Sequence, residues 1–361
     1  MKIAIKINFF QKVDTNVSQT PRAADTVAYL LAEELVKRNY NVTLFVTSDS
    51  ETSARIAANT FDSQDEDVKF CADFSAGKIN ENDLRFKDGQ IFFGKNLKKS
   101  YLNIVEQASQ FDLIHTHDWN VENSIAEYVK NIPVPVVTTL HGGRMKYDEV
   151  PRNHYFIAIS EFQKKLYSSL PIVGVAYNGI KIEDFEFSDT PEDYLAYLGR
   201  ITPDKGTLEA IEAAKRTQKR LLIGGNLDSA FPGYIRKFLE EVGSSDNIEY
   251  LGEVGKEKKN SLLKNANATL MPIQWDEPFG LVAIESMACG TPVIAWNRAA
   301  MPEIIEDGVS GYLINSVDEL IKRIGEIEQL SRSAVRKRVE EKFSARKMAE
   351  KYVELYEKIL G

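Results

Sequence analysis

The stretch “WDEPFGLVAIESMACGTPVIA”, residues 275–295, combines apolar segments with two glutamates that stand eight positions apart. The letters “ATLMPIQ” before it predict a strand, residues 276–280 predict a turn, and Leu281 to Cys289 predict a short helix. Gly290 is expected in the left-handed conformation that ends many helices, and Pro292 opens the next strand. The helix is apolar on nearly every side, so we expect it to be buried.

A carboxylate inside such a helix needs an explanation. An ionised and unpaired Glu285 would cost several kcal/mol, so it must have hydrogen-bond donors. Its side chain should tilt toward the helix N-terminus, where the amides of Phe279, Gly280 and Leu281 form an anion site. An anion site beside Glu285 and Glu277 suggests a ligand with phosphates and several hydroxyls, such as a nucleotide sugar. The alternative is a core glutamate with internal partners and an ordinary loop.

Positive charge for the phosphates is expected from “YLGRITPDKG”, residues 197–206. Arg200 follows a predicted strand, and Lys205 comes just before a helix that opens at Gly206. An arginine fork and a lysine point charge together suit a diphosphate. A surface salt bridge is the alternative for Arg200.

Beyond these motifs the chain alternates apolar strands with helices twice over. This pattern predicts an α/β protein with two doubly wound, Rossmann-like domains facing across a cleft, where ligands bind beyond the carboxyl ends of the strands. We place the first domain at residues 1–171, completed by a C-terminal helix at 344–361, and the second at 172–343. The polar region 49–100 could not be assigned.

Composition excludes several classes of protein. Apolar residues make up 43% and charged residues 27% of the 361 residues, which is typical of a water-soluble globular protein. A net charge of −8 argues against nucleic-acid binding, and two cysteines give no disulfide framework. The first residues alternate between polar and apolar, which is typical of a strand and not of a signal peptide. No apolar run is long enough to span a membrane, so we expect a cytoplasmic location.

The C-terminal segment carries a local excess of positive charge. Residues 331–361 contain nine lysines and arginines against five glutamates. A solvated amphipathic helix is the simplest interpretation, and peripheral contact with an anionic membrane at the inner face is the alternative.

Several segments resemble the retaining family-4 glycosyltransferases of the GT-B fold, and most of all a subgroup that includes enzymes of avilamycin biosynthesis. The similar segments are “GRITPDKG”, “EPFGLVAIES”, “ACGTPVIA”, “YNGI” at 177–180, “MPEIIEDGVSGYLI” and “KFSARKMAEKYVELYEKIL”. The resemblance covers essentially the whole chain. It departs from the family in the first loop, where “FFQKVDTNVSQTPRAADT” lacks the usual Gly-Gly pair.

The resemblance implies an enzyme that transfers a hexosyl group from a nucleotide-diphosphate sugar with retention of configuration. Arg200 and Lys205 would hold the donor diphosphate, Glu277 the transferred sugar and Glu285 the ribose, helped by the amides of Phe279, Gly280 and Leu281. His141, in “TTLHG”, would lie beside the reacting carbon. A UDP-sugar is favoured, a GDP-sugar comes next, and no metal or other cofactor is required.

The acceptor cannot be identified from the sequence and could be a glycan, a lipid or a small molecule. His117 and Asp118, in “HTHD” at 115–118, are candidates for the acceptor side. The same letters invite a metal-hydrolase interpretation, but no further histidine follows at the spacing such a site needs. Alternatives for the whole chain are a non-catalytic nucleotide-sugar-binding protein of the same fold and a GT-B epimerase.

Overall fold

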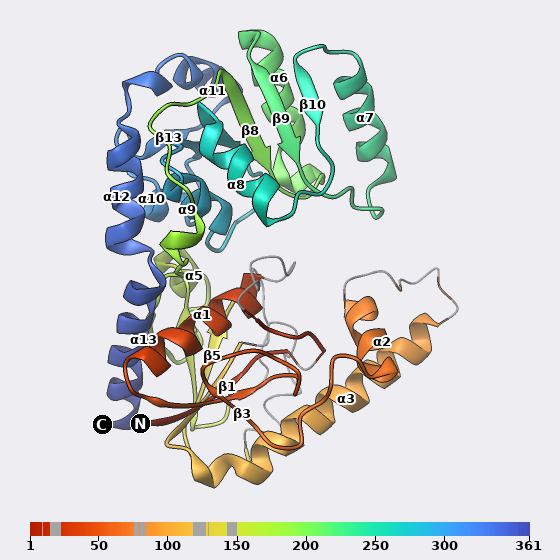
Figure 1. Cartoon of the computed structure of the whole chain (residues 1–361), viewed down its shortest axis with the longest axis vertical. Helices are drawn as coiled ribbons and strands as arrows, with labels where there is room; N and C mark the ends of the chain where they lie inside the picture. Colours follow the sequence, from red (N-terminus) through yellow and green to blue (C-terminus); the bar gives the residue numbers. More distant parts are fainter. Residues whose placement is uncertain are drawn as a thin grey trace. The chain divides into compact units, whose positions relative to one another are not determined.

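The computed structural model describes residues 1–8, 10–14, 23–75, 79, 83, 85–117, 128, 130–142 and 150–361. It divides into two compact units. Unit 1 comprises Met1–Ile159, Lys164–Ala176 and Met348–Gly361, and unit 2 comprises Ser160–Gln163 and Tyr177–Lys347. Figure 1 gives the order of the elements along the chain.

Unit 1 contains a seven-stranded parallel sheet in the order β3-β2-β1-β4-β5-β6-β7. Its strands are β1 (Lys2–Lys6), β2 (Asn41–Phe45), β3 (Arg55–Ile56), β4 (Leu113–Thr116), β5 (Val136–Leu140), β6 (His154–Ala158) and β7 (Ile172–Val175). β1, β2, β4 and β5 bury nearly every residue, as strands covered on both faces do. The predicted apolar runs are therefore strands of one sheet.

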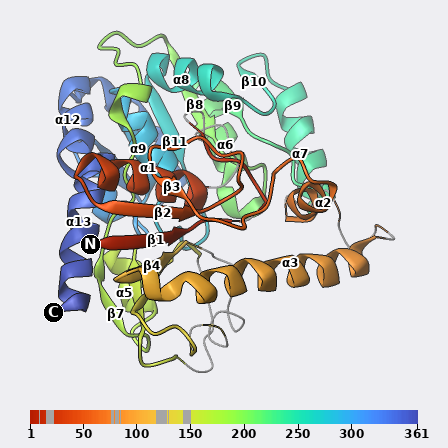
Figure 2. The same cartoon turned by 60° about the horizontal axis from the view of Figure 1, so that its bottom comes forward.

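The helices of unit 1 include two that the sequence did not predict. They are α1 (Ala23–Lys37), α2 (Glu66–Ser75), α3 (Phe86–Gln107), the 3₁₀ turn η2 (Ala108–Gln110), most of α13 (Ala345–Leu360) and the second half of α5 (Glu161–Leu166). α2 packs against α3 (Figure 2), and a Cβ on Gly89 would lie 2.8 Å from the ring of Phe74. The far end of α3 buries Tyr101 and Ile104 in the same apolar cluster as Ala4 and Ile114.

Unit 2 contains a six-stranded parallel sheet in the order β10-β9-β8-β11-β12-β13. Its strands are β8 (Tyr194–Leu198), β9 (Arg220–Gly224), β10 (Ile248–Tyr250), β11 (Ala268–Met271), β12 (Val293–Trp296) and β13 (Gly311–Ile314). All recorded strand pairs in both units are parallel, so the predicted α/β class is confirmed.

The helices of unit 2 alternate with strands as predicted up to the short helix expected at 281–289, and further helices that were not predicted follow it. They are α6 (Thr207–Thr217), α7 (Pro232–Gly243), α8 (Lys256–Asn265), α9 (Leu281–Ala288), α10 (Met301–Ile304), α11 (Val317–Ile324) and α12 (Arg332–Lys342), with 3₁₀ turns η3 (Ile182–Asp184), η4 (Pro203–Lys205) and η5 (Ile327–Gln329). Gly290 has φ +86°, as expected of the residue that ends α9. The basic segment forms α12 and α13, whose charged residues alternate with a buried face that includes Val335, Val339, Tyr352 and Tyr356.

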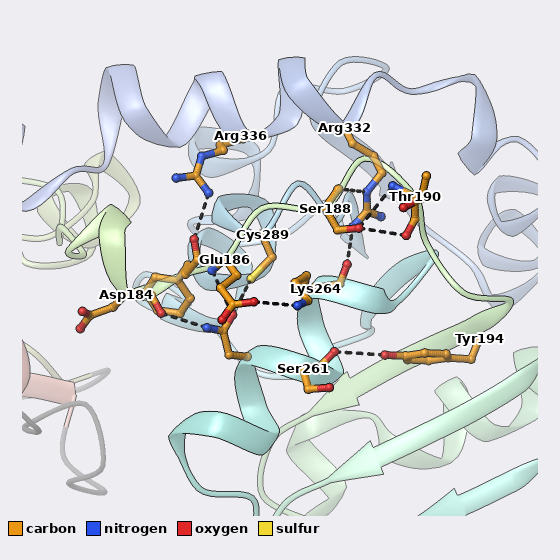
Figure 3. Close-up of polar contacts among 12 residues, drawn as sticks. Asp184, Glu186, Ser188, Thr190, Tyr194, Ser261, Lys264, Cys289, Arg332 and Arg336 are labelled. Carbon is orange, nitrogen blue, oxygen red and sulfur yellow. Dashed lines mark hydrogen bonds and ion pairs between the residues drawn. The ribbon is translucent and has the colours of Figure 1, made fainter.

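Arg332 connects three parts of unit 2, and Figure 3 shows it beside two of its partners, Ser188 and Lys264. Its guanidinium donates to the carbonyls of Ser188, Lys264 and Ala266 at 2.7–2.8 Å and to Thr291 Oγ1 at 2.6 Å. The carbonyls of Lys264 and Ala266 lie before β11, Thr291 lies before β12, and Ser188 lies in the segment leading into β8. Burial lowers the pKa of this guanidinium to about 10, which still leaves it charged at neutral pH. Four hydrogen bonds offset the desolvation of that charge.

The observed division of the chain falls after Ala176, whereas the sequence placed it after Pro171. β7 accounts for the difference, because its residues pair with β6 and so belong to the first sheet. The last helix begins in unit 2 and contributes Met348 onward to unit 1. No helix among the described residues is long and apolar enough to cross a membrane.

Candidate active site

The loop between β11 and α9 is fixed on several sides. Ser160 Oγ donates to the carbonyl of Pro278 at 2.7 Å, and the Ala300 amide donates to the carbonyl of Glu277 at 3.3 Å. The Gln274 amide donates to the carbonyl of Asp204 at 2.8 Å, which joins this loop to η4. The two motifs that the sequence singled out are thus neighbours in unit 2.

Close backbone packing brings them together. Gly206 has φ +71°, and a Cβ there would lie 1.8 Å from the carbonyl oxygen of Pro272. A Cβ on Gly225, after β9, would lie 1.8 Å from the carbonyl oxygen of Gly199, after β8. Only glycine permits backbone to approach backbone this closely. The carboxyl ends of β8, β9 and β11 therefore form a tight platform.

Lys205 and Glu277 form an ion pair on this platform. Lys205 Nζ lies 2.7 Å from Glu277 Oε2, and the side chains are only 17% and 15% exposed. Trp275 supports both, since its Nε1 donates to Glu277 Oε2 at 3.1 Å and its ring centroid lies 4.9 Å from Lys205 Nζ. A lysine and a carboxylate that were predicted to serve one ligand are thus in direct contact.

A pocket of about 140 Å³ opens beside this pair. It is lined by Tyr197, Leu198, Gly199, Lys205, Leu270, Met271, Ile273, Glu277, Gly280, Leu281 and Val282. Pockets for drug-sized ligands usually exceed roughly 300 Å³. This pocket therefore has room for part of a nucleotide sugar, and the remainder of such a ligand would lie outside it.

The N-terminus of α9 forms one wall of the pocket. Gly280 precedes the helix with φ +98°, and the first amides of a helix have no partner within it. Gly280 and Leu281 line the pocket, so these amides provide partial positive charge there. Phe279 faces away into a cluster with Tyr177 and Phe343, at ring distances of 6.2 and 6.0 Å, and is 2% exposed. Its side chain anchors the loop.

Arg200 does not line this pocket. Its side chain is 53% exposed, and its Nη1 lies 3.2 Å from Asp228 Oδ2. The preceding residue, Gly199, does line the pocket, so Arg200 leaves the platform at its rim. An exposed pair of this kind contributes little to stability, about 0–1 kcal/mol. The long side chain is therefore available to exchange Asp228 for another anion at low cost.

Glu285 has an internal partner that the sequence did not reveal. Lys259 Nζ, from α8, lies 2.7 Å from Glu285 Oε1, and both side chains are about 15% exposed. This pair provides the donor that a carboxylate in an apolar helix requires. Glu285 does not line the 140 Å³ pocket. If Glu285 binds a ribose, its carboxylate must accept hydrogen bonds from both the ribose hydroxyls and Lys259.

Glu303, which lies in one of the segments that resemble the family, makes hydrogen bonds within the protein. Its two carboxylate oxygens accept the amides of Glu161 and Phe162 at 2.7 Å each, at the start of α5. Tyr177 also donates its hydroxyl to Glu303 at 3.1 Å. Carboxylates stabilise helix N-termini in this way. Glu303 therefore holds Ser160 and its neighbours in unit 2.

The histidines form a separate group in unit 1. His117 and His141 follow the neighbouring strands β4 and β5, and His117 Nδ1 lies 2.8 Å from His141 Nε2. His115 packs on His117 with ring centroids 4.1 Å apart. Asp118, the other acceptor-side candidate, lies outside the described residues, as do residues 15–22 of the first loop.

Burial keeps these histidines neutral. It lowers the pKa of His115 and of His141 to about 3, and that of His117 well below its usual range. A neutral imidazole can act as one donor and one acceptor but contributes no charge at pH 7. Among the described residues, no group of three or more His, Cys, Asp or Glu side chains could hold a metal ion.

Three residues of the site were missed in the sequence. Trp275 stood in the quoted stretch two residues before Glu277, and this position next to a predicted functional loop was a usable signal. Lys259 is one of four lysines in “KEKKNSLLK”, and Asp228 is one acidic residue in a polar loop. Only tertiary packing distinguishes these two from their neighbours.

Two family models match consecutive parts of the chain. Residues 24–184 match “Glycosyltransferase Family 4”, and residues 180–346 match “Glycosyl transferases group 1”. The chain belongs to the family-4 glycosyltransferases. In this glycosyltransferase the second match contains the Lys205–Glu277 pocket, and the first contains the histidine group.

Relatives and solved structures agree with this assignment. An uncharacterized glycosyltransferase of Methanocaldococcus jannaschii is 26% identical over 68% of this chain and 75% of its own. A D-inositol 3-phosphate glycosyltransferase of Mycolicibacterium smegmatis is 35% identical over 36% of this chain, which covers only 30% of that relative.

Two crystal structures resemble this glycosyltransferase over nearly its full length. AviGT4, a glycosyltransferase involved in avilamycin A biosynthesis, aligns with a TM-score of 0.68 at 19% identity over 99% of this chain and 98% of its own. HepE of Anabaena, crystallised with UDP and glucose, aligns with a TM-score of 0.67 at 17% identity over 99% and 100%. At such identities the likeness establishes the fold, and the predicted GT-B fold is confirmed.

Proposed function

We propose that this enzyme transfers a hexosyl group from a nucleotide-diphosphate sugar to a glycan, lipid or small-molecule acceptor, with retention of configuration and without a metal ion. The observation that carries the proposal is the Lys205–Glu277 pair beside the N-terminus of α9. One wall offers positive charge to a diphosphate, and a carboxylate next to it accepts hydroxyl groups. A UDP-sugar is the first candidate, supported by the UDP and glucose in HepE, and a GDP-sugar is the second.

The residues divide the work as follows. Lys205, Arg200 and the amides of Gly280 and Leu281 stabilise the negative charge that grows on the diphosphate as the bond to the sugar breaks. Glu277 accepts sugar hydroxyls. Removing one such preorganised donor typically costs about 3–4 kcal/mol of transition-state stabilisation, a hundredfold or more in rate.

Two further residues take the roles that the family resemblance gives them. Glu285 accepts the ribose hydroxyls, and His141 acts at the transferred sugar as a neutral hydrogen-bonding group. His117 and Asp118 remain candidates for acceptor binding.

A thermal-shift panel tests the donor. UDP, GDP, ADP, dTDP and NAD are each added with EDTA and with magnesium to the wild type, to Lys205→Met and to the control Lys264→Met. A ligand at 100 times its dissociation constant adds about 2.7 kcal/mol, which is a shift of several degrees. We expect UDP to stabilise the wild type and Lys264→Met equally with and without metal, and Lys205→Met much less.

Turnover then distinguishes enzymes from binders. A nucleotide-diphosphate sugar that contains the stabilising nucleotide is incubated with the protein and with candidate acceptors. NMR then follows hydrolysis, transfer and the anomeric configuration of the product. Binding without any hydrolysis or transfer across many acceptors would instead indicate a nucleotide-sugar-binding protein. Interconversion of the nucleotide sugar without an acceptor would indicate an epimerase, and no stabilisation by any nucleotide would refute the proposal.

A further inference from the structure

The face of the unit 1 sheet that carries His115 and His117 also receives the last helix. Tyr352 and Tyr356 of α13 are fully buried there. Tyr356 OH lies 2.6 Å from His115 Nδ1, and Tyr352 OH lies 2.8 Å from Thr139 Oγ1. Thr139 Oγ1 in turn lies 2.8 Å from His115 Nε2. The two tyrosines thus fix His115 from both sides of its ring.

The contact with Tyr356 bears on which ring nitrogen of His115 carries the proton. Burial raises the pKa of the Tyr356 hydroxyl and lowers that of His115, so both groups are neutral at pH 7. Among the described residues, His115 Nδ1 is the recorded partner of the Tyr356 hydroxyl. A Tyr356 hydroxyl that donates to Nδ1 satisfies its own hydrogen. With that direction, we expect His115 to carry its proton on Nε2 and to donate it to Thr139 Oγ1.

The pair His117–His141 has the same kind of constraint. Both rings are neutral, so a single proton lies in the 2.8 Å contact between His117 Nδ1 and His141 Nε2. His117 Nε2 is buried and has no hydrogen-bond partner among the described residues. If the proton of His117 were on Nε2, a buried N–H would be left without an acceptor, which is rarer and costlier than a bare ring lone pair.

We propose that His117 is a positioning residue that holds His141 in its neutral Nδ1–H tautomer, and that Tyr352 and Tyr356 of the last helix hold His117 in place through His115. His117 Nδ1–H donates to His141 Nε2, and this leaves His141 to present Nδ1–H as a hydrogen-bond donor. The ring of His117 rests on that of His115 and lies 6.4 Å from that of Tyr352. The relevance to catalysis rests on the proposed role of His141.

The tautomer can be measured directly, because the chain has only four histidines. In protein labelled with ¹⁵N-histidine, protonated and unprotonated ring nitrogens have distinct shifts, and single-histidine variants assign them. We expect the proton of wild-type His141 on Nδ1 and that of His115 on Nε2. A proton on Nε2 of His141 would overturn the proposal, whatever the enzyme's activity.

Two substitutions then separate positioning from simple packing. His117→Asn can place an amide N–H near the position of Nδ1, whereas His117→Phe keeps an aromatic ring without a donor. For His117→Phe we expect loss of the fixed tautomer and a kcat lower by roughly tenfold or more, with the KM for donor unchanged, and for His117→Asn a recovery of most of that loss. His154→Gln, which removes another buried histidine from the same sheet, is the control and should retain the wild-type kcat.

The outcomes are distinguishable. Wild-type kcat in His117→Phe, with melting and folding unchanged, would overturn the positioning role. Equal losses in His117→Asn and His117→Phe would also overturn it, because packing alone would then explain the effect. If the wild type transfers no sugar to any acceptor, the proposed function fails, and the NMR measurement still decides the tautomer. Should His117→Phe not fold, the wild-type spectrum decides.

Discussion

Removing the partner of Glu285 should destabilise unit 2 strongly, and Lys259→Met is the substitution that tests this. Lys259 and Glu285 are 2.7 Å apart and only 15% and 14% exposed, so the pair is close to the buried limit. Breaking a buried pair by removing one partner costs about 3–5 kcal/mol, and breaking an exposed pair costs about 0–1. Given the residual exposure, we expect Lys259→Met to lower the free energy of unfolding by about 2–3 kcal/mol.

The reverse substitution should cost less. In Glu285→Gln the lysine left behind can move its ammonium toward water along a flexible stem, so we expect a loss of about 1 kcal/mol. The double variant should be similar to Glu285→Gln, which gives a coupling of about 2–3 kcal/mol in a double-mutant cycle. In a unit of this size, 1 kcal/mol corresponds to about 2–4 °C, so Lys259→Met should melt about 5–10 °C below the wild type.

Calorimetry and urea unfolding measure both effects. Lys264→Met is the matched control, because Lys264 lies on the same helix and pairs at 2.7 Å with Glu186, whose side chain is 70% exposed. We expect little change in its melting temperature. If Lys259→Met melts together with Lys264→Met, the pair with Glu285 does not form, and the reason for a carboxylate in α9 must be sought in the ligand alone.

Three other outcomes are expected. Arg200→Ala should keep the wild-type melting temperature, since its side chain is exposed, but lower kcat/KM by about a hundredfold or more; near-normal turnover would remove Arg200 from the mechanism. Gly206→Ala should lose more than about 2 kcal/mol of stability in urea unfolding, because its φ is +71° and the new Cβ would meet the carbonyl of Pro272; a stable variant would show that this contact relaxes. Burial lowers the pKa of His115 to about 3 and that of His154 to about 4, below the pKa of about 6.5 that each has in the unfolded chain. The contribution of these neutral histidines to the free energy of unfolding is therefore complete above about pH 6.5 and falls as the pH drops toward 4. The loss is up to about 1.4 kcal/mol per pH unit for each histidine. Between pH 7 and pH 4.5, urea unfolding should show a smaller decrease in the free energy of unfolding for His154→Gln than for the wild type. The same dependence on pH in both proteins would contradict a lowered pKa for His154.

Apolar runs predicted most strands because parallel strands covered on both faces must be apolar throughout. The strand β7 was not predicted, because its four residues are only half-buried and follow a proline. α3 was not predicted for a different reason: most of it lies in the polar region 49–100, which could not be assigned from its pattern, and its Gly89 packs where a Cβ would lie 2.8 Å from the ring of Phe74. A pattern within one segment cannot show a contact made by another.

The site followed the same division. Lys205, Glu277, Gly280 and Leu281 were placed together from the sequence because each follows a strand or begins a helix at one edge of the sheet, and they line one pocket. Arg200 and Glu285 were expected in that group but have partners of their own, Asp228 and Lys259, and do not line it. Those partners lie 28 and 26 positions away along the chain, beyond the reach of any local motif.

The glycines of the platform have a consequence for how this chain tolerates change. At Gly206 and Gly225 a single added carbon would lie 1.8 Å from a carbonyl oxygen, so every substitution there collides before the chemistry of its side chain matters. A saturation-mutagenesis map of the gene would therefore show intolerant positions beside the pocket at residues that touch no ligand. Arg200 should differ, because its side chain is exposed and an inactive variant there would still accumulate as folded protein. Scoring abundance and activity separately would thus draw the boundary between the scaffold and the chemistry, position by position.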